Sequence, residues 1–322
     1  MILAGDIGGT KTHLGLFAPD GNGPLRLSTY RSADYAHLAD LVGDFLSVHN
    51  AEVRYACLAV AAPMADGKGS VVNLPWPVYA HEIVERLRLP GVRVINDLEA
   101  NARGVAALGP EDFVVLNEGD LDATGNAAVI SAGTGLGEAG LYWDGERHHA
   151  FASEGGHADF APRSELEAAL CSQIELEYGH ASYERVCSGM GLANIYRFLG
   201  GPDADPAAIS QAALNGDERA GWALDLMVSI YGAEAGNVAL KLMATGGVYV
   251  GGGIAPKILP KLTNGAFMRA FVDKGRFRPL LERIPVRVIL NEKAALLGAA
   301  RCARSMLSGA EAAGERLTLV RS

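Results

Sequence analysis

The sequence predicts an α/β protein with two lobes, each built on a mixed sheet. Strands and helices alternate along the chain, which is the order of layered α/β folds. Two hairpins of the same outline lie at residues 2–17 and 129–143: an apolar strand, a turn of small residues and a second apolar strand. This weak internal duplication favours two lobes with related sheets. No low-complexity linker separates them, so we expect the lobes to share a hinge.

Hydrophobic periodicity and turn residues place the elements in order. The first half is expected to hold a hairpin, two buried strands and three helices, at 2–17, 55–61, 92–95, 34–48, 81–87 and 98–108. Beyond Gly109-Pro110 we expect a strand, the second hairpin, a strand at His148-His149 and three helices, at 113–116, 129–143, 164–178, 184–199 and 218–244. The chain closes with a strand, a glycine cluster and a helix around 246–256, a strand at 286–290 and an Ala/Leu-rich helix at 292–304.

Composition is that of a folded globular protein. Apolar residues make up 49% and charged residues 20% of 322 residues, so a core can form without disulfides or metals. The formal net charge is −9, which argues against a nucleic-acid partner because such proteins usually carry a basic surface. No apolar stretch is long enough to span a membrane, and the first residues lack a signal-peptide pattern.

The four cysteines do not form a motif. Cys57, Cys171, Cys187 and Cys302 lie far apart in the chain, so neither a CxxC pair nor a zinc-binding spacing is present. We expect buried, reduced thiols and a cytoplasmic location.

Three glycine-rich turns, each following a strand, indicate a phosphate-binding site. They lie at 5–10, 133–137 and 251–253. Glycine lets the backbone approach an anion closely, and successive N–H groups bind its oxygens. Each turn alone is compatible with an ordinary hairpin, and the three together are not. Asp6 stands within the first turn, and a carboxylate beside phosphates implies a bridging Mg²⁺.

Other nucleotide-binding motifs are excluded. The P-loop pattern GxxxxGK[ST] is missing from the sequence. Gly135, Gly137 and Gly140 match GxGxxG, but a dinucleotide site needs a helix directly after that motif. A strand and turn follow instead. The protein-kinase signatures are missing as well.

Two polar segments are candidates for substrate chemistry. Asn96-Asp97 follows the strand at 92–95, where α/β folds bind ligands, and a carboxylate there can act as general base toward a hydroxyl. The alternative is a helix N-cap. Glu154-Gly155-Gly156-His157 presents an acceptor and a switchable donor, which suits the hydroxyls of a sugar; the alternative is a polar surface loop. Glu184, near a helix start, is by itself an ordinary first-turn acid.

These motifs together resemble the bacterial glucokinases, ATP-dependent hexose kinases of the actin-like ATPase superfamily. Six segments carry the resemblance, in family order and over nearly the whole chain: 5–10, 96–97, 131–137, 154–157, 182–189 and 251–256. The resemblance implies two α/β lobes with an inter-lobe cleft, of the hexokinase/RNase H-like fold. It implies a small domain of residues 1–108 plus 298–322 and a large domain of residues 109–297.

The resemblance also implies roles for individual residues. The phosphates of ATP are held by two turns, formed by Gly5, Asp6, Ile7, Gly8, Gly9 and Thr10 and by Gly133, Thr134 and Gly135. The adenosine lies against Gly251, Gly252 and Gly253. Asp6 positions Mg²⁺ through water. Glucose is bound by Asn96, Asp97, Glu154, His157 and Glu184, with Asp97 as base for the 6-hydroxyl.

Some details depart from the family pattern or stay open. Lys11 stands where this branch often has Asn, and Met190 where Pro is common. The zinc-binding cysteines of the repressor/kinase branch are missing, which favours the zinc-free branch. A related kinase for mannose, fructose or N-acetylglucosamine is the alternative substrate assignment. Relatives imply a cytoplasmic homodimer with neither a nucleic-acid nor a membrane partner.

Overall fold

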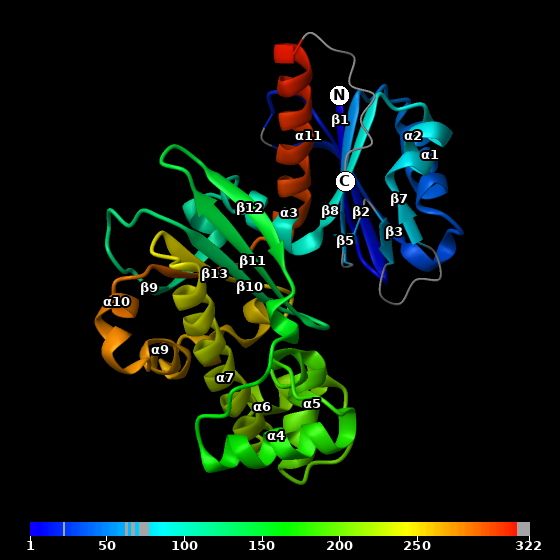
Figure 1. Ribbon diagram of the computed structural model, residues 1–322. Coiled ribbons are helices and arrows are strands. Elements are labelled where there is room, and N and C mark those ends of the chain that lie inside the picture. The colour runs from blue at the N-terminus through cyan, green and yellow to red at the C-terminus, as the bar shows by residue number, and fades with distance from the viewer. Residues whose placement is uncertain (22, 62–63, 66–67, 71–76, 314–322) are drawn as a thin grey trace. The chain divides into compact units, whose positions relative to one another are not determined.

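The computed structural model describes residues 1–313 apart from 22, 62–63, 66–67 and 71–76, and it forms two compact units (Figure 1). Unit 1 comprises Met1–Leu108 with Lys293–Ser322, and unit 2 comprises Gly109–Glu292. Each unit contains a mixed sheet, so the predicted α/β class with two mixed sheets is confirmed.

The sheet of unit 1 has five strands in the order β3-β2-β1-β4-β8. These strands are β1 (Ile2–Ile7), β2 (Lys11–Phe17), β3 (Pro24–Arg31), β4 (Tyr55–Val60) and β8 (Gly91–Asn96). The pairs β1–β2 and β2–β3 are antiparallel, whereas β4 and β8 run parallel to β1. A small second sheet consists of β5 (Met64–Ala65), β6 (Lys68–Ser70) and β7 (Pro77–Tyr79).

Continuous apolar strands give this sheet two buried faces. Leu3, Ile7 and Leu58 face one core cluster, and Ile2 and Cys57 face the other. Because side chains alternate along a strand, apolar residues at every position bury both faces. The first face is covered by α1 (Leu38–His49) and α2 (Ala80–Leu87), and the second by α3 (Asp97–Val105) and α11 (Ala294–Ala313) (Figure 1).

Helices α3 and α11 cross at close range because glycines stand at the crossing. A Cβ on Gly298 would lie 1.8 Å from the carbonyl oxygen of Ala100, and one on Gly104 would lie 2.0 Å from that of Ala294. The contact atoms are backbone and cannot move aside. These two glycines therefore set the distance between the helices.

The sheet of unit 2 repeats the strand order of unit 1 and adds one strand. Its order is β12-β11-β10-β13-β14-β9, with strands β9 (Phe113–Asn117), β10 (Ala127–Ala132), β11 (Leu136–Trp143), β12 (His148–Ser153), β13 (Gly247–Gly251) and β14 (Val286–Ile289). As in unit 1, three consecutive strands, β10 to β12, pair antiparallel, and β13 and β14 run parallel to β10. The predicted duplication is confirmed at the level of the sheets.

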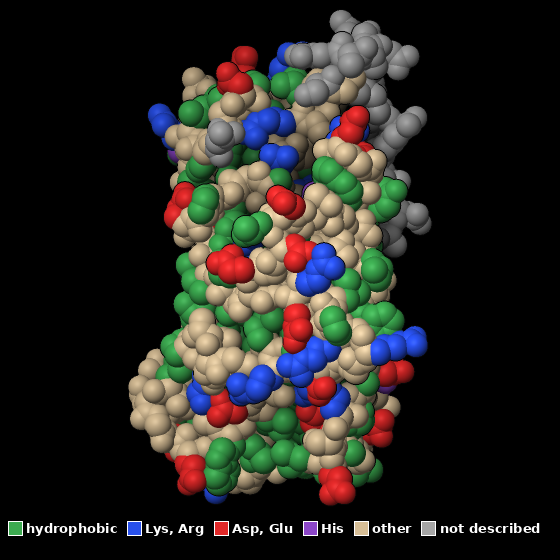
Figure 2. All heavy atoms as spheres, turned by 90° about the vertical axis from the view of Figure 1, so that its left-hand side faces the viewer, with side chains coloured by type: hydrophobic (Ala, Val, Ile, Leu, Met, Phe, Trp, Pro, Cys, Tyr) green, Lys and Arg blue, Asp and Glu red, His purple; other side chains and the backbone are tan. Residues whose placement is uncertain are grey.

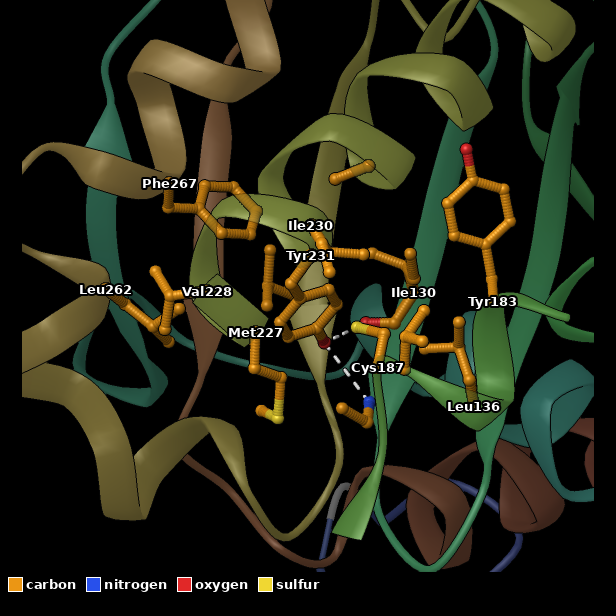
Figure 3. Close-up of a cluster of buried hydrophobic side chains, with 14 of the residues drawn as sticks. Ile130, Leu136, Tyr183, Cys187, Met227, Val228, Ile230, Tyr231, Leu262 and Phe267 are labelled. Carbon is orange, nitrogen blue, oxygen red and sulfur yellow. Dashed lines mark hydrogen bonds between the residues drawn. The ribbon is translucent and has the colours of Figure 1, made fainter. Parts of the chain in front are cut away.

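The long helix α7 (Glu218–Leu242) runs through the core of unit 2. Met227, Val228, Ile230 and Tyr231 on this helix contact the sheet and the neighbouring helices (Figure 3). The remaining helices of unit 2 are α4 (Glu165–Tyr178), α5 (Gly189–Phe198), α6 (Pro206–Leu214), α8 (Leu259–Leu262), α9 (Ala266–Val272) and α10 (Arg278–Glu282).

Three predicted helices differ from those observed. Residues 184–199 form a 3-10 turn, η4 (Tyr183–Arg185), and then α5, because the Ser188 hydroxyl caps a new helix by accepting from the Gly191 N–H at 3.0 Å. The chain after Gly253 forms a 3-10 turn, η5 (Ala255–Ile258), and only one turn of α-helix in α8. The helix predicted from residue 34 starts at Leu38, after a 3-10 turn, η1 (Ser32–Asp34).

Surface charges of both signs are intermixed on the face shown in Figure 2, where acidic and basic side chains alternate among apolar ones. Ion pairs among the described residues include Arg283 with Asp120 at 2.7 Å and Lys261 with Asp225 at 2.8 Å. Within the described part of the chain, no helix is both long and apolar enough to cross a membrane.

Candidate active site

The glycine turn after β1 and the Asn96–Asp97 pair lie at the same end of the sheet of unit 1. Strands β1, β4 and β8 run parallel, with Ile7 opposite Val60 and Val60 opposite Asn96. The turn after β1 and the Asn96–Asp97 pair after β8 therefore follow carboxyl ends that only one strand separates. This is the edge at which open α/β sheets bind ligands.

The turn from Gly8 to Thr10 is held in shape by Ser32. The Ser32 hydroxyl donates to the carbonyl oxygen of Gly8 at 2.7 Å, and the Ser32 N–H donates to that of Thr10 at 3.1 Å. Within the turn, the Gly8 N–H donates to the Lys11 carbonyl at 3.0 Å. These hydrogen bonds hold the backbone of the turn in its shape without a ligand.

Gly5 differs from the other glycines of its motif because it lies inside β1. It pairs with Leu14 on one side and Leu58 on the other. A Cβ on Gly5 would lie 2.6 Å from Leu58 Cδ2 and 2.9 Å from Leu14 Cδ2. The structure therefore gives Gly5 a packing reason of its own, and its contact with phosphate stays a prediction. Ile7 is fully buried at the end of the same strand.

Asp6 lies near the carboxyl end of β1, directly across from His13 on β2. Burial raises the pKa of its carboxyl group above the ordinary value, and the facing His13 lowers it. A cation nearby would favour the charged form. Mg²⁺ binds through one or two carboxylates together with waters and substrate phosphates, so a single carboxylate beside a glycine turn fits this ion. Among the described residues, no group of three or more potential ligands could hold a metal without substrate.

Asn96 and Asp97 stand at different positions of the start of α3. Asn96 is the N-cap of α3, and its Oδ1 accepts from the N–H groups of Leu98 at 2.8 Å and Glu99 at 3.3 Å. Asp97 is the first helical residue, and its Oδ1 also accepts from the Leu98 N–H, at 2.9 Å. The N-cap alternative therefore applies to Asn96, and the carboxylate of Asp97 stands at the positive end of a helix dipole.

In unit 2 the turn at Gly133–Gly135 is bound from two sides. The Gly133 carbonyl accepts from the Gly189 N–H at 2.8 Å, and Glu184 Oε2 accepts from the Leu136 N–H at 3.1 Å. A Cβ on Gly135 would lie 2.2 Å from the same Oε2. Glu184 therefore touches the predicted phosphate turn through one oxygen and leaves the other for a second partner.

That second partner is His157. Its Nδ1 lies 4.0 Å from Glu184 Oε1, and its Nε2 lies 3.9 Å from Glu154 Oε2. The His157 and Glu154 side chains are more than half exposed, whereas that of Glu184 is 20% exposed. Three predicted sugar-binding side chains, from two segments well separated in sequence, thus converge and remain open to a ligand.

Backbone pairing brings these segments together. The Tyr183 N–H donates to the Ala158 carbonyl at 3.1 Å, and the Phe160 N–H donates to the Ala181 carbonyl at 2.8 Å. The chain just after His157 is thus joined to the chain just before Glu184. His157 itself ends the 3-10 turn η3 (Gly155–His157), which Glu154 begins as N-cap.

The third glycine cluster lies beside the second. Gly252 has a φ of +83°, and a Cβ there would lie 2.3 Å from the Ala132 carbonyl oxygen. The Ile254 N–H donates to that oxygen at 3.2 Å. Below, the Tyr231 hydroxyl accepts from the Ala132 N–H at 3.1 Å and lies 3.0 Å from the Ile130 carbonyl oxygen (Figure 3). The ends of β10 and β13 are thereby held side by side.

The sequence analysis missed several residues that shape the site. Ser32 and Tyr231 act on backbone groups far away in the chain, and no local pattern reveals them. Glu138 could have been noticed, because it is an acidic residue in the middle of an apolar strand. Ser131, at the end of β10, has a buried hydroxyl with no partner in the described structure, close to Gly251.

Comparison with known proteins extends over nearly the whole chain. The glucokinase family model matches residues 3–306. A glucokinase from Synechocystis sp. is 42% identical, with 94% of this chain and 97% of the relative covered. The crystal structure of glucokinase from an Antarctic psychrotroph is 32% identical and has a TM-score of 0.85 over 94% of this chain and 98% of that one. A ROK family glucokinase from Streptomyces griseus, solved with glucose and AMPPNP, is 22% identical with a TM-score of 0.68, covering 94% and 99% of the two chains. The fold is therefore that of the two-lobed actin-like ATPases.

Proposed function

The chain belongs to the glucokinase family, and from this membership we propose that it transfers the terminal phosphoryl group of ATP to the 6-hydroxyl of D-glucose. The products are glucose 6-phosphate and ADP. The observation that carries the proposal is the convergence of Glu154, His157 and Glu184 beside the glycine turn at Gly133–Gly135. The Streptomyces griseus glucokinase holds both glucose and AMPPNP.

Glu154, His157 and Glu184 are proposed to bind glucose hydroxyls, together with Asn96. Carboxylates accept hydrogen bonds from hydroxyls, and the ring nitrogens of His157 can donate or accept them. A site built this way discriminates among sugars because a misplaced hydroxyl leaves a polar group unpaired, at about 1–3 kcal/mol per group. Glu184 additionally ties this site to the Gly133–Gly135 turn.

The turns at Gly8–Thr10 and Gly133–Gly135 are proposed to bind the ATP phosphates, and Gly251–Gly253 the adenosine. Glycine lets backbone N–H groups approach phosphate oxygens. Asp6 would hold Mg²⁺ through water, and the ion would neutralise charge on the phosphates. Asp6 itself supplies the negative charge that keeps the ion beside the turn.

Asp97 is proposed to accept the proton of the sugar 6-hydroxyl. An alcohol is a weak nucleophile, and a carboxylate within hydrogen-bond reach can take its proton as the bond to phosphorus forms. The N–H groups at the start of α3 stabilise the carboxylate. In a loose transition state the same contact also orients the attacking oxygen.

A panel of hexoses with ATP and Mg²⁺ tests the proposal. We expect kcat/KM for glucose to exceed that for mannose, fructose and N-acetylglucosamine. A higher value for one of these three would make the protein a sibling hexose kinase. No phosphorylation of any hexose would refute the proposed function.

The proposal includes a cytoplasmic homodimer. The four cysteines are all free, as expected in a reducing compartment. Light scattering at micromolar concentration tests the oligomeric state, with the mass of two 33.7 kDa chains expected.

A further inference from the structure

A buried carboxyl group lies directly beneath the sugar-binding turn. Glu138 on β11 is 5% exposed, and its Oε1 has no hydrogen-bond partner in the described structure. Its Oε2 would lie 1.9 Å from a Cβ on Gly155. The space that a side chain at 155 would need is thus filled by the Glu138 carboxyl group. Glu154 and His157 flank this glycine pair on either side.

A second buried carboxyl group, Glu234 on α7, is fully paired where Glu138 is not. Its side chain is fully buried, with Oε1 3.3 Å from Lys241 Nζ and Oε2 accepting from Asn237 Nδ2 at 2.7 Å. The same Nδ2 donates to the Tyr183 hydroxyl at 2.9 Å. Tyr183 precedes Glu184, so this network supports the other side of the sugar site. Glu234 has a cation to balance its charge.

The surroundings of Glu138 favour its uncharged form. Burial and the negative charge of Glu234 raise the pKa of Glu138 to about 8, and Lys241 lowers it less. The other titratable groups that interact with it are Cys187, after η4, and Tyr231 on α7, and the pKa of each is raised by burial. Both are therefore neutral near pH 7 and bring no positive charge to Glu138.

We propose that Glu138 is a positioning residue for sugar binding: its protonated carboxyl group seats the Gly155–Gly156 turn and thereby sets the places of Glu154 and His157. When the proton is lost, an anion with an unpaired oxygen lies between buried Glu234 and the turn. Water must then reach it, and because the carboxyl group lies against Gly155, displacement of the turn would admit that water. Sugar affinity falls as the turn moves. The sugar part of the inference rests on the proposed function, whereas the motion of the turn does not.

Steady-state kinetics between pH 7 and pH 9 test the sugar part. The protonated fraction of a group with a pKa near 8 falls about tenfold over this range, so we expect the KM for glucose to rise about tenfold. Glu138→Gln keeps the shape of the side chain but removes its titratable group. Its KM for glucose should not change with pH and should be close to the wild-type value at pH 7. Glu146→Gln, at an exposed acid after β11, is the matched control and should follow the wild type.

Hydrogen exchange of the sugar-free protein tests the motion itself. After correction for intrinsic rates, amides of residues 153–158 should exchange faster at pH 9 than at pH 7 in the wild type and in Glu146→Gln, and equally at both in Glu138→Gln. A wild-type KM that stays flat, or a Glu138→Gln variant that shows the same rise as wild type, would overturn the role in sugar binding. Equal exchange in the wild type at both pH values would overturn the coupling, whichever sugar the enzyme uses.

Discussion

The carboxylate of Asp97 and the amide of Asn96 are neighbours with separable tasks. Because Asn96 provides the N-cap, the helix start does not depend on a charge at residue 97. Asn at position 97 keeps an acceptor for the Leu98 N–H. The structure thus allows the proposed base to be removed while the start of α3 is kept.

Asp97→Asn should reduce kcat by at least about 10², on the scale of general-base catalysis. Its melting temperature should stay near that of the wild type, and glucose binding should remain within about tenfold. Stopped-time assays and calorimetry measure these quantities. Asp217→Asn, the same change of residue type at the start of α7 and outside the candidate site, is the control. A kcat within about fivefold of wild type would rule Asp97 out as the base.

Glu154→Ala and His157→Ala should each raise the KM for glucose and narrow the difference between glucose and its epimers. The physical reason is the loss of hydroxyl partners, about 1–3 kcal/mol each. The ratio of kcat/KM values for glucose and mannose reports the discrimination. If both ratios equal that of the wild type, the two residues form only a surface loop.

Asp6→Asn should increase the concentration of Mg²⁺ needed for half-maximal rate while leaving glucose affinity unchanged. Removing the carboxylate takes away the charge proposed to hold the cation. Titration of the rate with Mg²⁺ at saturating ATP measures the effect, and intrinsic fluorescence measures glucose affinity. An unchanged Mg²⁺ dependence would contradict the assignment.

At the scale of elements, close packing of helices depends on missing side chains. Gly298→Ala would press a Cβ onto the Ala100 carbonyl at the α3–α11 crossing, and overpacking of this kind costs about 1–3 kcal/mol. Gly221→Ala, in α7 with no neighbour within 4 Å of the added Cβ, should instead stabilise by about 0.5–1 kcal/mol through helix propensity. The urea concentration at the midpoint of unfolding should fall for Gly298→Ala and rise for Gly221→Ala. A neutral Gly298→Ala would show that the helices can separate freely.

Local patterns predicted most elements, and long-range pairing explains those they missed. The hairpins around Gly8 and Gly133 and helices α4 and α7 show their periodicity and their turn or cap residues within a short window. Strand β3 is largely exposed, so alternation was weak. Helix α6 has an Asp205 N-cap and Pro206 at its first position. Both residue types indicate a helix start, so this helix could have been predicted from the sequence.

The same limit holds for the candidate site. The sequence indicated Glu154, His157 and Glu184 as candidates, but their convergence depends on the pairing of residues 158–160 with 181–183. The effect of the Glu234 charge on Glu138 depends on α7 packing against the sheet, which no local window contains. The division into domains at 108/109 and 297/298, and the roles of single residues, stay predictions.

At the scale of the whole molecule, the five strands of the first sheet and five of the six strands of the second share one order. In unit 2, Glu138 lies in the buried layer against the Gly155–Gly156 turn. The free energy of unfolding should therefore depend on the protonation of Glu138. Its folded pKa of about 8 lies above the ordinary 4.5, so the folded state keeps a proton that the unfolded chain releases between these values.

Its contribution is thus fully present below about pH 4.5 and is lost as pH rises toward 8, by up to about 1.4 kcal/mol per unit. Glu138→Gln removes this dependence. We expect the variant to gain stability relative to the wild type as pH rises from 5 to 8, measured by thermal unfolding at both values. A difference in melting temperature that is the same at pH 5 and pH 8 would contradict the raised pKa.

The hydroxyl of Tyr231 has an evolutionary consequence. It serves the Ala132 N–H and the carbonyls of Ile130 and Gly251 at once, from the centre of the core. Phenylalanine would fill the same volume but would leave that N–H buried and unpaired. Selection for a well-packed interior and selection for the shape of the turn proposed to bind nucleotide therefore act on one atom, and sequence drift at this position is constrained from both directions.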